Sequence, residues 1–367
     1  MKDILLLKQA LPYLRRHKGR TMVVKLGGEI AADAEALRSL AEDISLLTHV
    51  GIRVCVVHGG GPQATAMSRR LGLQPRMVEG RRVTDRETLD VAKMVFAGQV
   101  NMDILAALRL QGARAVGLSG VDGDLLQAVR RKPVEVRDAD SGEVSVVDYG
   151  HVGDVTHVDV AVLDTLMGDG FVPVVSSLAG DVDGNVLNVN ADTVSSVLAR
   201  ALEAYKLISL TAIPGVLTNA DDPTSVVPVL TPKAAQEAID QGIVRGGMKP
   251  KVLSLVEAVE HGVERGHILS GLAEGALLLE LFTKKGSGTL VATEAHAPAA
   301  ALAGTGGEPT LAAEAGVPPR APWTCGRPAC AFRPYRAARR TVGMPWQLGS
   351  KLTAFRLAPT AATCWPR

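Results

Sequence analysis

Short apolar segments alternate with amphipathic helices along the first 295 residues. Residues 21–25 and 53–57 are Val-rich and read as buried parallel strands, and residues 34–49 between them repeat apolar side chains at helical spacing. The same alternation predicts helices at 86–111, 160–168, 193–203, 231–241 and 250–261, and strands at 113–118, 171–176, 206–211, 275–282 and 288–292. It predicts an α/β fold, a three-layer αβα sandwich around a mainly parallel sheet, with ligands bound at the carboxyl ends of the strands.

The composition changes sharply near residue 295. Residues 296–367 contain all three tryptophans and three of the four cysteines, and their Lys and Arg exceed Asp and Glu by seven, which leaves the first 295 residues at a net charge of −5. This Ala-, Pro- and Arg-rich segment has no helical or strand period and is predicted to be a disordered, low-complexity tail. Either a frame-shifted or read-through extension or a lineage-specific disordered arm would explain it. Cys325 and Cys330 are too far apart in sequence to suggest a zinc site.

The overall composition excludes several other classes of protein. Hydrophobic residues make up 47% of the chain, yet no continuous apolar run reaches the roughly 18 residues that a membrane span needs. The apolar start is too short for a signal peptide, and Cys55 within a strand suggests a reducing environment, so we expect a cytoplasmic protein. Because the predicted folded part is acidic, nucleic acid is not expected as a partner.

Two glycine-rich turns carry the first indication of chemistry. One strand runs into Gly59-Gly60-Gly61-Pro62 and then a helix, and an earlier strand ends in Lys25-Leu26-Gly27-Gly28. Glycines let backbone N–H groups approach a ligand closely, and a helix N-terminus favours phosphate or carboxylate oxygens. A lysine beside two such turns suggests transfer of a phosphoryl group. The sequence contains neither GxxxxGK[ST] nor a GxGxxG that opens a helix after a strand, which argues against a P-loop or a dinucleotide-binding enzyme.

Two further clusters are expected at the same edge of the sheet. Asn188-Val189-Asn190-Ala191-Asp192 follows one predicted strand, and Gly246-Gly247-Met248-Lys249-Pro250-Lys251 precedes a predicted helix. Together with the Lys25 turn they would supply two lysines and an aspartate that organises them. Alternatively, Asp192 is only a helix N-cap, and Lys249 is more typical of a surface residue.

The ordered set of motifs is similar to a known family. It includes Val24–Gly28, Val57–Gln63, Gly80–Thr84, Pro173–Ser177, Asn188–Asp192, Gly247–Lys251 and Leu277–Thr283. Residues 4–290 thereby resemble the amino acid kinase superfamily, and most closely the N-acetylglutamate kinases of arginine biosynthesis. The resemblance implies ATP-dependent phosphorylation of the γ-carboxylate of N-acetyl-L-glutamate, with Mg²⁺ carried by the nucleotide and no metal site on the protein.

The resemblance also implies roles for individual residues. Lys25 and Lys251 would stabilise the transferring phosphoryl group, and Asp192 would organise both lysines. Gly27 and Gly28 would contact the nucleotide.

Four further residues would bind the acceptor substrate. Gly59 and Gly60 would bind acceptor and γ-phosphate oxygens. Arg82 would pair with the α-carboxylate, and Asn188 would contact the acylated amino acid.

An arginine-sensitive subtype is implied by the N-terminal segment. Residues 4–16 resemble the mobile helix of arginine-inhibited hexamers, which are trimers of dimers, with Tyr13, His267, Glu280 and Gly288 near the effector. The corresponding organisation is an oligomerisation or effector helix at 1–20, an acyl-amino-acid lobe at 21–180, a nucleotide lobe at 181–295 and the tail. Alternatively, the helix serves only subunit packing.

Some positions depart from the family pattern and keep rival functions open. Glu29 stands where many kinases have asparagine, and Ala212 where aspartate is common. GGE at the first motif is found in kinase-like domains of N-acetylglutamate synthases, although the 72-residue tail is too short for their acetyltransferase domain. The departures are also compatible with a catalytically silent arginine-sensing or scaffold subunit, and with a kinase that acts on N-acetyl-aminoadipate.

Overall fold

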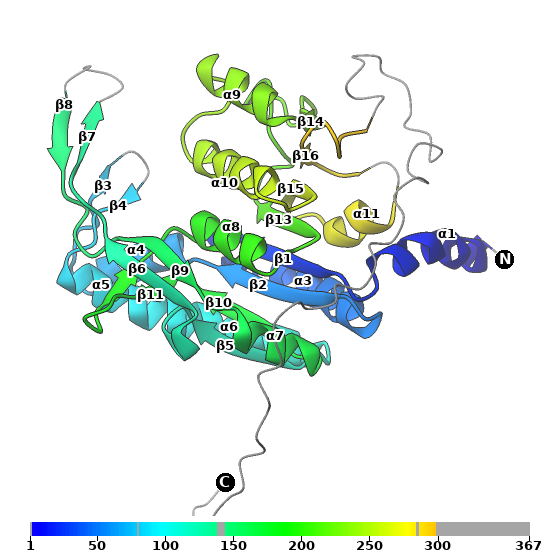
Figure 1. The fold of residues 1–367 in the computed structure, drawn as a ribbon, viewed down its shortest axis with the longest axis horizontal. Coiled ribbons are helices and arrows are strands. Elements are labelled where there is room, and N and C mark those ends of the chain that lie inside the picture. The colour runs from blue at the N-terminus through cyan, green and yellow to red at the C-terminus, as the bar shows by residue number, and fades with distance from the viewer. Residues whose placement is uncertain (1, 79–80, 138–143, 284–285, 299–367) are drawn as a thin grey trace, which may run out of the picture. The chain divides into compact units, whose positions relative to one another are not determined.

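The computed structural model describes residues 2–78, 81–137, 144–283 and 286–298, and it is built on a central eight-stranded sheet (Figure 1). The strand order is β14-β16-β15-β13-β1-β2-β10-β5. The pairs from β15 through to β5 are parallel, β16 runs antiparallel to β15, and β14 is parallel to β16. The predicted mainly parallel α/β sandwich is confirmed.

The elements have the following bounds. The strands are β1 (Thr21–Leu26), β2 (Arg53–His58), β3 (Met77–Val78), β4 (Arg81–Arg82), β5 (Ala115–Ser119), β6 (Leu126–Arg130), β7 (Val134–Arg137), β8 (Val144–Val147), β9 (Gly153–Val158), β10 (Val172–Ser176), β11 (Leu178–Gly180), β12 (Val186–Asn188), β13 (Lys206–Thr211), β14 (Val229–Leu230), β15 (Arg265–Ser270) and β16 (Thr289–Val291). The helices are α1 (Lys2–His17), α2 (Gly28–Ala32), α3 (Ala34–His49), α4 (Gly61–Arg70), α5 (Arg86–Ala92), the π-helix η1 (Lys93–Val100), α6 (Asn101–Leu110), the 3₁₀ turn η2 (Asp122–Asp124), α7 (Ala161–Gly168), α8 (Ala191–Ala201), α9 (Pro232–Asp240), α10 (Met248–Glu260) and α11 (Ala276–Phe282).

Alternate residues of the central strands face two separate cores. Met22 and Val24 of β1 pack with α3, η1 and α6, whereas Val23 between them packs with α7, α8 and α10. This follows from the two-residue period of a strand, and both faces are apolar because helices cover both. Figure 1 shows α8 and α3 on opposite sides of β1 and β2.

The carboxyl ends of β1 and β2 lie next to each other, because Leu26 pairs in register with His58. Each strand leads through glycines into a helix, α2 or α4. A smaller sheet, β12-β11-β6-β9, and the hairpins β3–β4 and β7–β8 are also present.

One predicted strand is wrong and another was missed. Residues 276–282 form helix α11, and the five residues after Ala276, which are Leu and Glu, include no β-branched side chain that would favour a strand. The strand beside β13 is β15, whose four central residues are buried although Arg265, Gly266 and His267 are not typical strand formers. The predicted helix at 86–111 is continuous, but its middle turns are π-helical, which the apolar periodicity did not indicate.

The helical stretch Arg86–Leu110 is long and apolar enough by composition to cross a membrane, with a mean hydropathy of 1.3. Its apolar residues Val91, Val95, Phe96, Val100 and Ile104 are buried in the core. A core helix passes the same test, so this composition is explained by packing on the sheet. The predicted tail at 296–367 lies almost entirely outside the described residues.

Stability should fall as the pH is lowered from 6.5 towards 4. Burial lowers the pKa of His17, His58 and His267 to about 4 each, so the unfolded chain takes up more protons in this window. Each histidine contributes at most about 3 kcal/mol, at about 1.4 kcal/mol per pKa unit. Burial raises the pKa of Asp43 to about 6, so Asp43 acts in the opposite direction. Its effect on the free energy of unfolding offsets that of about one of the three histidines.

Urea unfolding at pH 6.5 and 4.5 would measure this effect, with an expected loss of several kcal/mol in the free energy of unfolding. An unfolding free energy that stays constant over this range would contradict the assignment of three buried, neutral histidines.

Candidate active site

The two glycine-rich turns pack directly against each other at the ends of β1 and β2. Gln63 Nε2 donates to the Gly28 carbonyl at 2.8 Å. A Cβ on Gly28 would lie 2.6 Å from Pro62 Cδ, so only glycine lets the turns approach this closely. The helices α2 and α4 therefore begin side by side, and their N-termini face the same region.

Gly60 is held on its other side by the π-helix. A Cβ at this position would lie 2.7 Å from Phe96 Cδ1 and 3.2 Å from Val100 Cγ2. Gly60 is also the N-cap of α4, with Pro62 in the first turn, as the sequence predicts. Phe96 and Val100 of η1 thus leave no room for a side chain at position 60, so only glycine fits at this point of the turn.

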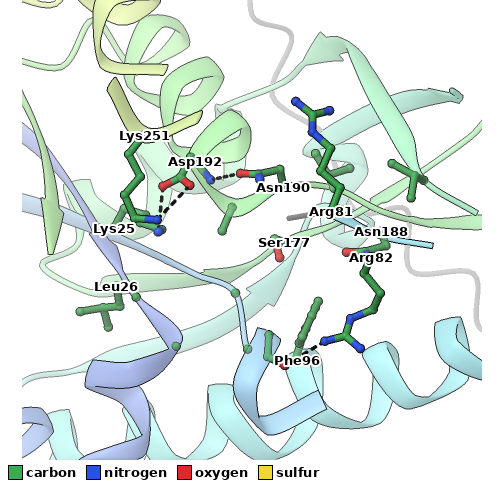
Figure 2. Close-up of a pocket in the computed structure, with 18 of the residues that line it drawn as sticks. Lys25, Leu26, Arg81, Arg82, Phe96, Ser177, Asn188, Asn190, Asp192 and Lys251 are labelled. Atoms are coloured by element: carbon green, nitrogen blue, oxygen red, sulfur yellow. Dashed lines mark hydrogen bonds and ion pairs between the residues drawn. The ribbon is translucent and has the colours of Figure 1, made fainter. Parts of the chain in front are cut away.

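Two lysines converge on one buried carboxylate. Lys25 Nζ lies 2.8 Å from Asp192 Oδ1, and Lys251 Nζ lies 3.8 Å from Asp192 Oδ2. Lys25 lies on β1, Asp192 in the first turn of α8, and Lys251 in the first turn of α10. Asp192 is not the N-cap of α8; that is Asn190, whose side chain accepts from the Asp192 N–H. Figure 2 shows the three charged side chains meeting.

The charges in this cluster set one another's protonation. Burial alone would raise the pKa of Asp192, but Lys25 and Lys251 outweigh it and hold the pKa below its usual value. Burial lowers the pKa of Lys251, and Lys25 adds to the effect, whereas Asp192 and Glu29 oppose it. The cluster therefore holds an ionised carboxylate under two cations, an arrangement that can receive further negative charge.

A second cationic group, Arg82, lies in the same pocket. Its Nη2 donates to the Gly61 carbonyl at 3.0 Å and to Thr65 Oγ1 at 2.6 Å. Its Nη1 is buried and has no hydrogen-bond partner among the described residues. A buried guanidinium nitrogen without an acceptor is suited to a carboxylate ligand. Nearby, Asn188 Nδ2 donates to Thr84 Oγ1 at 3.1 Å.

Every residue predicted for catalysis, nucleotide binding or acceptor binding lines this one pocket. These are Lys25, Gly27, Gly28, Gly59, Gly60, Arg82, Asn188, Asp192 and Lys251. In the view of Figure 2, Asp192 and the lysines lie at one end, and Arg82 and Asn188 at the other.

The pocket also contains side chains for which no role was predicted. Ser177 lies between the two ends in Figure 2, and its place directly after β10 was the signal that could have found it. Arg131 lines the pocket and pairs with Asp154, with its Nε at 2.9 Å from Oδ1. No local pattern indicates Arg131, because its position depends on the pairing of β6 with β9. Glu29, noted as a departure, lines the pocket as well.

The residues predicted near an arginine effector lie elsewhere. His267 Nδ1 lies 2.7 Å from Glu280 Oε1, and His267 Nε2 lies 3.1 Å from Lys206 Nζ. Lys206 pairs in register with Met22, at the amino end of the sheet. Gly288 packs closely on Ile268, where a Cβ would lie 2.1 Å from the carbonyl oxygen.

Within the described part of the chain, no group of three or more His, Cys, Asp or Glu side chains could hold a metal ion. Asp192 is already occupied by two lysines, so its carboxylate is poorly placed as a primary metal ligand. A divalent cation in this pocket would therefore depend mainly on oxygens that a ligand brings with it.

A mainly parallel α/β sandwich with lysines and glycine turns at the strand ends defines a class of protein, the phosphoryl-transferring α/β enzymes that lack a P-loop. The family model "Amino acid kinase family" matches residues 20–270. The chain belongs to the amino acid kinase family, as its motifs predict, and is a kinase.

Its similar proteins include curated acetylglutamate kinases. The enzyme of Methanothermobacter thermautotrophicus is 41% identical over 79% of this chain and 99% of its own length. That of Myxococcus xanthus is 46% identical over 81% of this chain and 96% of its own. A solved N-acetylglutamate synthase from Neisseria gonorrhoeae, complexed with coenzyme A and N-acetyl-glutamate, has a TM-score of 0.67 at 29% identity. The match covers 79% of this chain but only 63% of that longer one.

Proposed function

We propose that this chain transfers the γ-phosphoryl group of ATP to the γ-carboxylate of N-acetyl-L-glutamate, in arginine biosynthesis. The O–P bond to ADP breaks, a bond from the carboxylate oxygen to phosphorus forms, and the products are an acyl phosphate and ADP. The observation that carries the proposal is the Asp192-centred lysine pair in one pocket with the unpartnered Nη1 of Arg82. The similarity to acetylglutamate kinases supports the choice of acceptor.

The lysine end of the pocket would act on the phosphates. Lys25 and Lys251 carry the charge that stabilises phosphoryl oxygens in the transition state, and Asp192 keeps the two ammonium groups from separating. Gly27 and Gly28 would lie against the nucleotide phosphates, with the Gly28 N–H as the donor, because the Gly27 N–H already donates to the Leu210 carbonyl at 3.0 Å.

The Arg82 end would hold the acceptor. Arg82 binds the α-carboxylate and Asn188 the acylated amino group, which leaves the γ-carboxylate near the turn at Gly59 and Gly60. No general base is needed, because a carboxyl group with a pKa near 4.3 is already ionised at neutral pH.

Mg²⁺ would arrive with ATP, held mainly by phosphate oxygens of the nucleotide, and would neutralise part of their charge. The chain's own part is to provide the lysines and N–H groups that surround the phosphates.

The direct test is acyl phosphate formation with MgATP, trapped as the hydroxamate. N-acetyl-L-glutamate should be preferred about tenfold or more over N-acetyl-L-aminoadipate, because one methylene is worth about 1–3 kcal/mol. Equal or better use of the longer acceptor would overturn the substrate assignment. No product from a folded chain with either acceptor would favour a silent sensor or scaffold subunit.

Replacing Arg82 with lysine should raise KM for the acceptor about tenfold and change kcat less. Lysine keeps the charge but loses the planar fork that can pair with a carboxylate while still donating to Thr65. Steady-state kinetics with varied N-acetyl-L-glutamate would measure this. The matched variant is Arg81→Lys, one residue away in the same pocket, and a larger effect there would show that Arg81 is the acceptor residue.

A second candidate property is inhibition by L-arginine at the His267–Glu280 cluster. His17 Nδ1 and Tyr205 Oη are buried without a hydrogen-bond partner among the described residues, and the two rings lie 5.5 Å apart. His17 Nε2 contacts the Leu281 carbonyl at 3.1 Å, in the helix that carries Glu280. A solved N-acetylglutamate synthase from Neisseria gonorrhoeae, complexed with coenzyme A and L-arginine, is 27% identical to this chain with a TM-score of 0.66.

Arginine titration of the kinase would test this, with Glu280→Gln compared at the same concentrations. Inhibition that is lost in Glu280→Gln supports an effector site, and an unchanged rate up to millimolar arginine removes it. Tyr13 as an effector contact, the hexamer, the two lobes and the cytoplasmic location stay predictions.

A further inference from the structure

A buried pair of polar side chains lies directly behind the Gly59–Gly60 turn. His58 is 0% exposed and Asn101 is 3% exposed. Asn101 Nδ2 lies 3.0 Å from His58 Nε2 and also 3.0 Å from the Val174 carbonyl oxygen. Neither side chain is among the described residues that line the pocket, so a contact with substrate does not explain them.

The contacts fix which ring nitrogen of His58 carries the proton. The Val174 carbonyl can only accept, so the atom of Asn101 that faces it must be the amide nitrogen. Its second hydrogen is then directed to His58 Nε2, which must be the unprotonated acceptor. The proton therefore lies on Nδ1, which donates to the Gly59 carbonyl at 2.8 Å.

This hydrogen bond orients a peptide group of the site. The Gly59–Gly60 peptide is planar, and in a trans peptide the carbonyl and the following N–H point in opposite directions. Holding the Gly59 carbonyl against His58 therefore directs the Gly60 N–H away from the buried pair. Phe96 and Val100 press on Gly60 from the helix side and limit any rotation of the turn.

The position of Asn101 depends on two further features. It follows the eight-residue π-helix η1, and such segments are frequent at functional sites. On β5, a Cβ at Gly117 would lie 2.0 Å from Asn101 Oδ1, so the strand accommodates the amide only because residue 117 is glycine.

We propose that His58 and Asn101 form a positioning pair that orients the Gly59–Gly60 peptide so that the Gly60 N–H meets an oxygen of the transferring phosphoryl group. The pair acts by orienting the turn, and neither side chain takes up a proton during the reaction. Burial lowers the pKa of His58 to about 4, which agrees with a neutral ring at working pH. The inference rests on the kinase function proposed above.

The first test needs no activity. In ¹⁵N-histidine NMR of the intact chain, His58 should be the tautomer protonated at Nδ1, unchanged from pH 8 to pH 5.5. A resonance pattern with the proton on Nε2, or a cationic ring at neutral pH, would overturn the proposal. A chain inactive with N-acetyl-L-glutamate would contradict the proposed function but leave this readout intact.

The second test compares two amides at position 58. The amide nitrogen of asparagine can take the place of Nδ1, whereas that of glutamine lies nearer to Nε2. The kcat of His58→Asn should stay within about threefold of that of the unchanged chain. The kcat of His58→Gln should fall about tenfold or more, while the KM for the acceptor changes little. Equal kcat in the two variants would contradict the positioning role. His261→Gln, at an exposed histidine, is the control for the substitution itself.

Discussion

Lys25→Ala and Lys251→Ala should each lower kcat for acyl phosphate formation about 10²- to 10³-fold, the loss typical of removing one preorganised donor for transition-state charge. Both ammonium groups lie on Asp192, at 2.8 and 3.8 Å, and each would also contact phosphoryl oxygens during transfer. Because this charge develops mainly in the transition state, KM for the acceptor should change little. Quench-flow or steady-state hydroxamate assays at saturating MgATP would measure the effect.

The chain offers a matched control for the second lysine. Lys249 lies two residues before Lys251 in the same first turn of α10, but it is exposed and does not line the pocket. Lys249→Ala should retain kcat within about twofold. Equal losses in the two variants would mean that the first turn of α10 matters for folding and that Lys251 has no special role. Circular dichroism would confirm that Lys25→Ala, which removes a buried charge, still folds.

Asp192→Asn should lower kcat about 100-fold and also destabilise the fold. Asparagine keeps the shape but removes the charge between two lysines, and breaking one partner of a buried ion pair costs about 3–5 kcal/mol. The carboxylate raises the pKa of Lys251 against the effect of burial, so without it the pKa of Lys251 should fall further. The alkaline limb of the pH–rate profile should therefore move to lower pH.

Two measurements separate these effects. Urea unfolding gives the stability loss, and kcat from pH 6 to 9.5 gives the position of the alkaline limb. Asp240→Asn, at an exposed aspartate at the end of α9, should change neither. A variant with normal kcat and an unshifted alkaline limb would show that Asp192 only stabilises the fold.

The fold class could be predicted because buried parallel strands and amphipathic helices leave different periods in the sequence. The strands at 21–26 and 53–58 have side chains buried on both faces, which requires a continuous apolar run. The failure at 276–282 has the same origin. An apolar Leu-rich run can form either a buried strand or a short helix. Here its packing against α3 and β15 decides for the helix α11.

The candidate site was predictable where ligand-binding groups sit in local motifs. Lys25, Gly59, Gly60 and Lys251 each lie within a few residues of a strand end or helix start, and parallel topology brings those ends together. The sequence by itself thus determined the α/β class and the set of glycines and lysines that meet at one edge of the sheet.

Only the tertiary structure decided which polar side chains touch. It placed Asp192 between two lysines and assigned the N-cap to Asn190, and it brought Arg131 into the pocket. It also set Asn101 against His58 across 43 positions of sequence. Such contacts depend on packing between residues far apart in the chain, at ångström precision, and neither the period of a strand nor the spacing of a motif carries that information.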